Sequence, residues 1–165
     1  IELENGWNLF STYIDPIENN FIDLFATIID FVVIVKDNQG LAYLPDWEFN
    51  GIGDLIYSQG YQVKMLENSN LLISGSILEP ELNPISLSVG WNMISYLRNS
   101  PADAGLVFQS LVDFDNLVIA KDNQGNAFLP EWGFNGIGNL YSGEGYKLKV
   151  VDSQELLYIS NNLEY

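Results

Sequence analysis

Apolar and polar residues alternate along two short stretches of the chain, residues 61–65 (YQVKM) and residues 146–150 (YKLKV). Successive side chains of an extended chain point to opposite faces, so this alternation predicts two strands with one buried face each. Residues 31–35 (FVVIV) and 117–120 (LVIA) are apolar runs of strand length, rich in β-branched side chains. They predict two further strands.

Each of these runs leads into the same five residues, KDNQG, at positions 36–40 and 121–125. Asp, Asn and Gly form turns, and Gly40 and Gly125 can adopt the positive φ angle that such a turn needs. Residues 42–44 then follow as the return strand of a hairpin. A loop rich in Gly, Asn and Trp comes next.

A helix is expected before each hairpin. In the first half it begins at Asp15-Pro16, and apolar residues then recur at helical spacing on one face: Ile17, Phe21, Leu24, Phe25 and Ile28. In the second half Ser100 is the expected N-cap, with Pro101 at the first helical position and Asp103 in the first turn.

The two halves of the chain repeat one another. Residues 36–53 and 121–138 agree at 14 of 18 positions, KDNQGLAYLPDWEFNGIG against KDNQGNAFLPEWGFNGIG. Gly-Trp-Asn recurs upstream at 6–8 and 90–92, and Gly-Tyr recurs downstream at 60–61 and 145–146. Chance does not give this much agreement, so the chain contains two copies of one folding unit.

We therefore expect two homologous modules, residues 1–78 and 85–165, joined by a proline-containing linker at 79–84. Each is predicted as a β-α-β-β-β-β unit, which makes the fold α+β and β-rich with mainly antiparallel sheets. Two copies would pack with approximate two-fold pseudosymmetry, each covering an apolar face that the other cannot hide alone.

Charge and composition narrow the classes of function. The 22 acids and 6 bases give a net charge of −16, which repels nucleic-acid phosphates and anionic lipids. No apolar run reaches the roughly 18 residues that a membrane span needs. We expect no nucleic-acid partner and no membrane insertion; a protein or glycan surface is the expected partner, and self-association stays open.

The absence of Cys and His excludes thiol nucleophiles, Ser-His-Asp triads and the usual zinc sites. Carboxylates recur at Asp37 and Asp122 and at Asp46 and Glu131, where a glycosidase pair could be imagined. A plain turn is the better interpretation of Asp37, since Asp there bonds its own backbone. We expect no enzymatic activity and no cofactor, and a weak calcium site at Asp37 and Asp122 is the alternative to the turn.

Tryptophans of the Gly-rich loops are the candidate ligand-binding residues. Trp47 and Trp132 are expected to stack on a sugar, to cap the core, or to pack the two copies against each other. Asn50, Tyr57, Asn135 and Tyr141 complete the candidate set. The Asn residues also suit a structural role, because Asn tolerates a left-handed backbone. Structural roles are expected for Trp7 and Trp91, which would fill the core, and for Tyr61 and Tyr146.

Four of the six cations occupy equivalent positions in the repeat: Lys36 with Lys121, and Lys64 with Lys149. We expect them to pair with acids on neighbouring strands and to protect sheet edges.

Together, Gly-Trp-Asn, the central KDNQG with Pro-x-Trp, and Gly-x-Gly-Tyr cover nearly the whole chain. They resemble the repeat modules of large secreted or cell-surface prokaryotic proteins and of some marine phage virion proteins. Ser58 stands in the first half where the pattern has the first Gly, Gly143. The resemblance implies an extracellular, cell-surface or virion location and a non-catalytic role, and it carries over no functional residues.

The expected function is that of a structural or interaction module for display, adhesion or assembly. A carbohydrate-binding module that uses the loop tryptophans is one alternative, and a self-assembling filament, shell or virion subunit is another.

Overall fold

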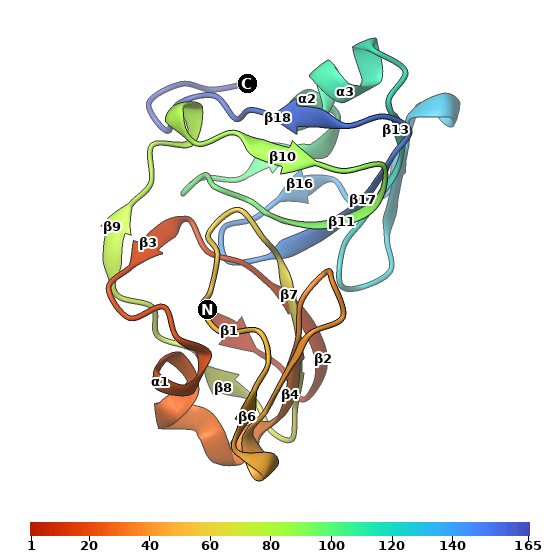
Figure 1. Cartoon of the computed structure of the whole chain (residues 1–165). Coiled ribbons are helices and arrows are strands. Elements are labelled where there is room, and N and C mark those ends of the chain that lie inside the picture. Colours follow the sequence, from red (N-terminus) through yellow and green to blue (C-terminus); the bar gives the residue numbers. More distant parts are fainter.

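The computed structural model describes residues 1–165 as two similar halves, each built around one five-stranded antiparallel sheet (Figure 1). The strand order is β2-β7-β4-β5-β6 in the first half and β11-β17-β13-β14-β15 in the second. In chain order, the strands of these two sheets are β2 (Gly6–Phe10), β4 (Val32–Lys36), β5 (Ala42–Leu44), β6 (Phe49–Asn50), β7 (Tyr61–Met65), β11 (Gly90–Ser95), β13 (Leu117–Lys121), β14 (Ala127–Leu129), β15 (Phe134–Asn135) and β17 (Gly145–Val150). The α+β, β-rich fold with paired antiparallel sheets is confirmed.

Shorter elements cover one face of each sheet. Four small two-stranded sheets pair β1 (Glu2–Leu3) with β8 (Ser69–Asn70), β3 (Ile14–Pro16) with β9 (Gly75–Ile77), β10 (Ile85–Leu87) with β18 (Gln154–Leu156), and β12 (Ala102–Asp103) with β16 (Asn139–Leu140). The helices are α1 (Phe21–Phe25), α2 (Ala104–Val107) and α3 (Gln109–Asp113), with 3₁₀ turns η1 (Ala26–Phe31), η2 (Pro45–Trp47), η3 (Pro80–Leu82) and η4 (Pro130–Trp132).

The predicted helix of the first half begins later than its proline suggests. Residues 14–16 pair with β9 as a strand, so Ile17 stays 77% exposed and does not join the helical face. Asn20 is the N-cap instead, and its side chain accepts a hydrogen bond from the Ile22 N–H. A cap needs an extended backbone and a side-chain oxygen, and Asn20 supplies both.

The second helix also begins at a different residue from the one expected. The N-cap is Asp103, whose carboxylate accepts hydrogen bonds from the Gly105 and Leu106 N–H groups. Ser100 and Pro101 therefore lie before the helix. Two residues, Ala102 and Asp103, first pair with β16, and this pairing delays the start of the helix.

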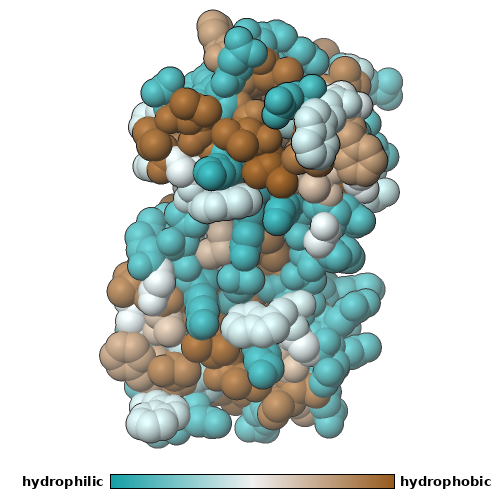
Figure 2. All heavy atoms as spheres, turned by 90° about the vertical axis from the view of Figure 1, so that its right-hand side faces the viewer, coloured by the Kyte–Doolittle hydropathy of each residue, from teal (hydrophilic) through white to brown (hydrophobic).

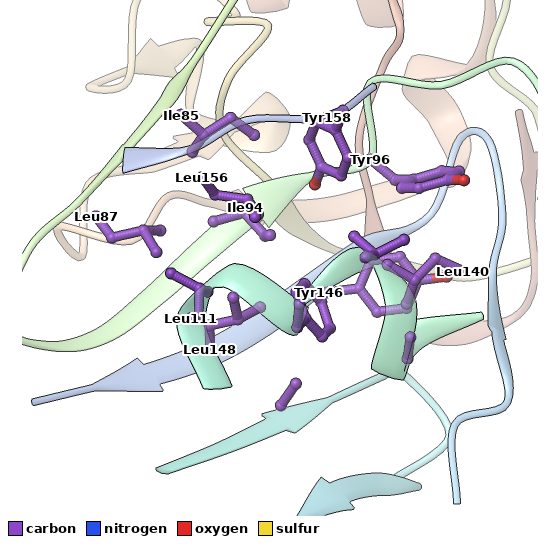
Figure 3. Close-up of a cluster of buried hydrophobic side chains, with 14 of the residues drawn as sticks. Ile85, Leu87, Ile94, Tyr96, Leu111, Leu140, Tyr146, Leu148, Leu156 and Tyr158 are labelled. Atoms are coloured by element: carbon purple, nitrogen blue, oxygen red, sulfur yellow. The ribbon is translucent and has the colours of Figure 1, made fainter. Parts of the chain in front are cut away.

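Each half buries its own apolar cluster. In the first half, rings from α1, β2, β5 and β7 pack together, and the Phe21 and Tyr61 ring centroids lie 5.0 Å apart. In the second half, Tyr96, Tyr146 and Tyr158 lie among leucines from β10, β17 and β18 (Figure 3). Leu78 packs into this second cluster.

The halves are joined by reciprocal backbone contacts. The Ser11 N–H donates to the Gly143 carbonyl over 2.9 Å, and at the equivalent place the Ser95 N–H donates to the Ser58 carbonyl over 3.4 Å. Isolated antiparallel bridges flank them, Phe10 with Glu144 and Gln59 with Ile94. Each half thus extends the end of its edge strand, β2 or β11, onto the residues just before β17 or β7 of the other half, which gives the contact its two-fold character.

This contact explains the Gly of the repeated Gly-Tyr pair. A Cβ atom on Gly60 would lie 2.7 Å from the Ile94 carbonyl oxygen, and one on Gly145 would lie 2.9 Å from the Phe10 carbonyl oxygen. Both obstacles are backbone atoms of the other half and cannot rotate away. Gly is required here by close approach of two backbones.

We predict that Gly60→Ala lowers the free energy of unfolding by about 1–3 kcal/mol, because the added methyl group separates the halves. Chemical denaturation followed by circular dichroism measures this. Gln59→Ala is the matched control: its bridge to Ile94 uses backbone atoms only, so a change within about 0.5 kcal/mol is expected. Equal losses in both variants would contradict the backbone-contact explanation.

Candidate functional site

The Gly-Trp-Asn motif directs its tryptophan outward. Gly6 has a φ angle of 94°, and the buried Asn8 closes the preceding loop by accepting from the Glu4 N–H and donating to the Glu4 carbonyl. Asn92 does the same with Ser88 after Gly90, whose φ angle is 93°. Only Gly adopts this backbone freely.

The prediction that Trp7 and Trp91 fill the core is therefore wrong. Their side chains are 45% and 47% exposed on the outer sheet faces, away from the buried clusters. A lysine ammonium lies over each indole, with Lys36 Nζ 5.4 Å from the Trp7 ring centroid and Lys121 Nζ 5.8 Å from that of Trp91. This cation–π contact occupies the same place in both halves.

The outer faces concentrate the positive charge of an acidic protein. The ten strands of the two five-stranded sheets contain no Asp or Glu. They hold five of the six cations, namely Lys36, Lys64, Lys121, Lys147 and Lys149. The sixth, Arg98, is buried and donates to the Leu163 carbonyl.

The prediction that the lysines pair with acids on neighbouring strands is wrong. Lys64 lies between Trp7 and Ile34 in the sheet register. Lys149 lies between Trp91 and Ile119 at the equivalent place. Because no strand of either sheet contains a carboxylate, each outer face combines ammonium groups with exposed aromatic and aliphatic surface. Figure 2 shows pale and brown side chains spread among polar ones over both halves on this side of the molecule.

The aspartates of KDNQG stabilise their own turns. Asp37 Oδ1 accepts from the Gln39 and Leu41 N–H groups, and the Asp122 carboxylate accepts from the backbone and side-chain nitrogens of Asn126. Gly40 and Gly125 close these turns with φ angles of 88° and 89°. No group of three or more Asp or Glu side chains gathers at either turn. Weak calcium binding at Asp37 and Asp122 stays a prediction.

The asparagine of the same turn binds the other half. Asn38 Oδ1 accepts from the Met93 N–H over 3.0 Å, and its Nδ2 donates to the Trp91 carbonyl over 3.3 Å. Asn123 reciprocates, donating to the Trp7 carbonyl over 3.1 Å. These amides occupy the free edges of β11 and β2 and so block further strand pairing there. The repeat did not indicate this role, because identical residues in two copies do not show which partner their side chains bind.

The loop tryptophans are the most exposed candidates. Trp47 and Trp132 end the turns η2 and η4 and are 79% and 74% exposed, so neither caps the core nor packs the halves together. Phe49 and Phe134 next to them are also exposed. Each loop thus presents two aromatic rings at the end of its sheet.

The other members of the candidate set do not join these rings in a site. The Asn50 side-chain amide binds the N–H and the carbonyl of Gly53. The Asn135 amide binds the N–H and the carbonyl of Gly138 in the same way and also donates to Asp103. Both amides therefore close their loops. Tyr57 packs against the second core, and its carbonyl accepts from the Ser95 hydroxyl at the contact between halves. Tyr141 is half exposed and donates its N–H to the Tyr146 hydroxyl.

The buried tyrosines of the Gly-Tyr pair satisfy backbone groups inside each half. The hydroxyls of Tyr61 and Tyr146 each accept an N–H bond of 2.8 Å, from Ile56 and Tyr141 respectively. Burial raises the pKa of Tyr61 to about 12. Burial and the hydrogen bond that the Tyr146 hydroxyl donates to Glu144 raise the pKa of Tyr146 far above its usual value.

Comparison of the chain with known protein families, with characterised proteins and with solved structures found no match. None of its helices has the length and apolar character that crossing a bilayer requires.

The inter-half role of Asn38 predicts the effect of Asn38→Asp. A carboxylate cannot donate to the Trp91 carbonyl and repels it, so the free energy of unfolding should fall by about 1 kcal/mol. Gln39→Glu adds the same charge to the exposed neighbouring residue and should leave the free energy of unfolding within about 0.5 kcal/mol of the wild type. Urea titrations of both variants decide this, and indistinguishable midpoints would rule out the Asn38 contact as a stabilising bond.

Alkaline pH should destabilise the fold through the buried tyrosines. The folded pKa of Tyr61, about 12, exceeds the ordinary value of 10.0, so the folded state holds its proton longer than the unfolded state. The contribution of Tyr61 to the free energy of unfolding is therefore fully present below pH 10 and is lost as the pH rises towards 12. Denaturant titrations at a series of pH values measure this. A free energy of unfolding that stays constant over that interval would contradict it.

Proposed function

We propose that this chain is a non-catalytic interaction module of a secreted, cell-surface or virion protein. Its two halves would hold a partner against the outer faces of the sheets. The observation that supports this most strongly is the same face built twice: an exposed tryptophan beneath a lysine ammonium, on strands that carry no acid.

Exposed indoles of this kind favour binding over a purely structural role. Four tryptophans expose between 45% and 79% of their surface, and none of them fills a core. Covering an exposed apolar ring with a partner removes it from water and so favours binding. Trp is also enriched among the residues that contribute most to binding free energy. The scaffold beneath them is fixed by the inter-half bonds, so the faces keep a set distance and orientation.

The disposition of the acids favours binding over catalysis. Asp37 and Asp122 are engaged by their own turns. Asp46 and Glu131 lie on the exposed turns η2 and η4 beside the loop tryptophans. A glycosidase needs two carboxylates on opposite sides of a bound sugar. Asp46 and Glu131 instead each stand on an exposed turn of a different half.

A neutral-glycan platform at the loop tips is the second candidate. Trp47 and Trp132 present the largest exposed ring surfaces in the chain, and a sugar stacks on such a ring through its C–H face. Self-association by strand pairing has less support, because Asn38 and Asn123 occupy the β11 and β2 edges while β6 and β15 are two residues long.

Binding without turnover can be measured on the immobilised protein. Neutral probes (mannan, xylan, β-glucan) and acidic probes (alginate, polygalacturonate) are passed over it, and bound mass is recorded together with new reducing ends after prolonged contact. We expect at least one probe to be retained and no new reducing ends. Trp47→Ala and Trp132→Ala separate the second candidate, since they should abolish retention of neutral probes only.

Two results would count against the proposal. New reducing ends that increase with protein concentration would make the chain an enzyme. Failure to retain any probe would remove glycans as the partner.

A further inference from the structure

A groove of about 470 Å³ lies where the two outer faces meet. The second half lines it with Trp91, Met93, Lys121 and Lys147, and the first half with Asn38 and Gln62. The waist between the halves in Figure 2 shows how the two faces approach each other on this side. The groove therefore exists only because the halves pack together.

Two lysines face each other in this groove without an acid between them. Lys121 on β13 lies directly opposite Lys147 on β17, and the next partners outward are Ala127 and Met93. Like charges placed opposite each other on neighbouring strands destabilise a sheet. The only carboxylate of the lining, Asp37, already accepts two backbone N–H groups of its own turn.

The first half does not repeat this pair. Gln62 stands opposite Lys36 at the place where Lys147 stands opposite Lys121. The same strand pairing forms with a neutral residue at this place, so the second lysine is not needed for the pairing. A cost in stability without a structural return is typical of a binding site.

We propose that this groove binds an acidic polysaccharide of the uronate class, with a sugar carboxylate bridging the Lys121 and Lys147 ammonium groups. This inference rests on the proposed function and names its ligand. The half-exposed Trp91 ring supplies the apolar surface against which a sugar ring packs, and the Gln62 amide supplies hydrogen bonds for hydroxyls. Ion pairs to ammonium groups fix the orientation of the carboxylate.

A sugar fits this groove better than an acidic peptide does. Peptides commonly bind a sheet by adding a strand to its free edge. Here the edge groups of β11, the Met93 N–H and the Trp91 carbonyl, are already bound by Asn38. A polysaccharide needs no such backbone partner.

A uronate also suits the overall charge better than a nucleic acid does. Duplex DNA carries one negative charge per roughly 1.7 Å, and the net charge of −16 opposes its approach over the whole surface. A uronate chain carries one carboxylate per sugar, spaced further apart than the charges of duplex DNA, so the net charge repels it less strongly, and the carboxylate in the groove meets the local positive charge of Lys121 and Lys147.

The test uses tetragalacturonate as the probe, with its carboxyl-reduced neutral form and tetraglutamate as matched probes, in isothermal titration calorimetry at low and physiological salt. Wild-type protein should bind tetragalacturonate and neither matched probe. Lys147→Gln reproduces the residue of the first half and should weaken binding about tenfold. Lys64→Gln removes the same charge from the outer face away from the groove and should change affinity less than about twofold.

A second pair of variants tests the ring. Trp91→Ala should weaken tetragalacturonate binding about tenfold, whereas Phe114→Ala, which removes an exposed ring after α3 and outside the groove, should leave it unchanged. Thermal melts of all four variants show that each is folded.

Each contrary result has a defined meaning. Equal weakening by Lys147→Gln and Lys64→Gln would show diffuse attraction and overturn the groove. Equal binding of tetraglutamate would overturn the sugar assignment. Binding of the neutral tetrasaccharide as tight as that of tetragalacturonate, or retention of neutral polysaccharides alone, would overturn the acidic ligand while leaving the proposed function intact. New reducing ends would instead overturn the proposed function.

Discussion

The close backbone contact between the halves is the constraint on which the rest of the structure depends. Ser11 and Ser95 place the ends of β2 and β11 on the opposite half, and Gly60 and Gly145 allow the chains to touch. The Asn of each KDNQG turn then covers the edge that remains. Several of the most clearly repeated residues therefore serve the contact between the halves. In a two-fold contact each half supplies both complementary surfaces, so both copies must contain the residues of both surfaces.

That arrangement also determines where charge can lie. The inner sheet faces are buried, and the acids are confined to turns, helices and short strands outside the two large sheets. The lysine-bearing faces therefore remain as separate surfaces whose charge is opposite in sign to that of the acidic periphery. The net charge of −16 does not show that lysines and acids occupy separate surfaces, and by itself it predicts repulsion of every anion.

Sequence patterns predicted the strands well and the site poorly, for physical reasons. Period-two alternation located β7 and β17, since one buried face leaves a clear pattern. The outward direction of Trp7 could not be foreseen, because it depends on a buried Asn8 and on a lysine from a strand more than twenty residues away. The helix starts were displaced because residues 14–16 and 102–103 pair with strands that are distant in sequence. The inter-half role of Asn38 depends on a contact made across 55 residues of chain.

In a duplicated scaffold, differences between copies carry information that identities do not. Positions where the interface leaves no alternative are filled alike in both halves, as Gly60 and Gly145 are, and positions required by folding are filled by residues of similar chemistry, as the N-caps Asn20 and Asp103 are. A position where one half has Gln62 and the other Lys147, with the same strands around it, is released from that requirement. The pseudosymmetric scaffold thus acts as its own internal control, and a charged residue that only one copy carries at a shared groove is best explained by what binds there.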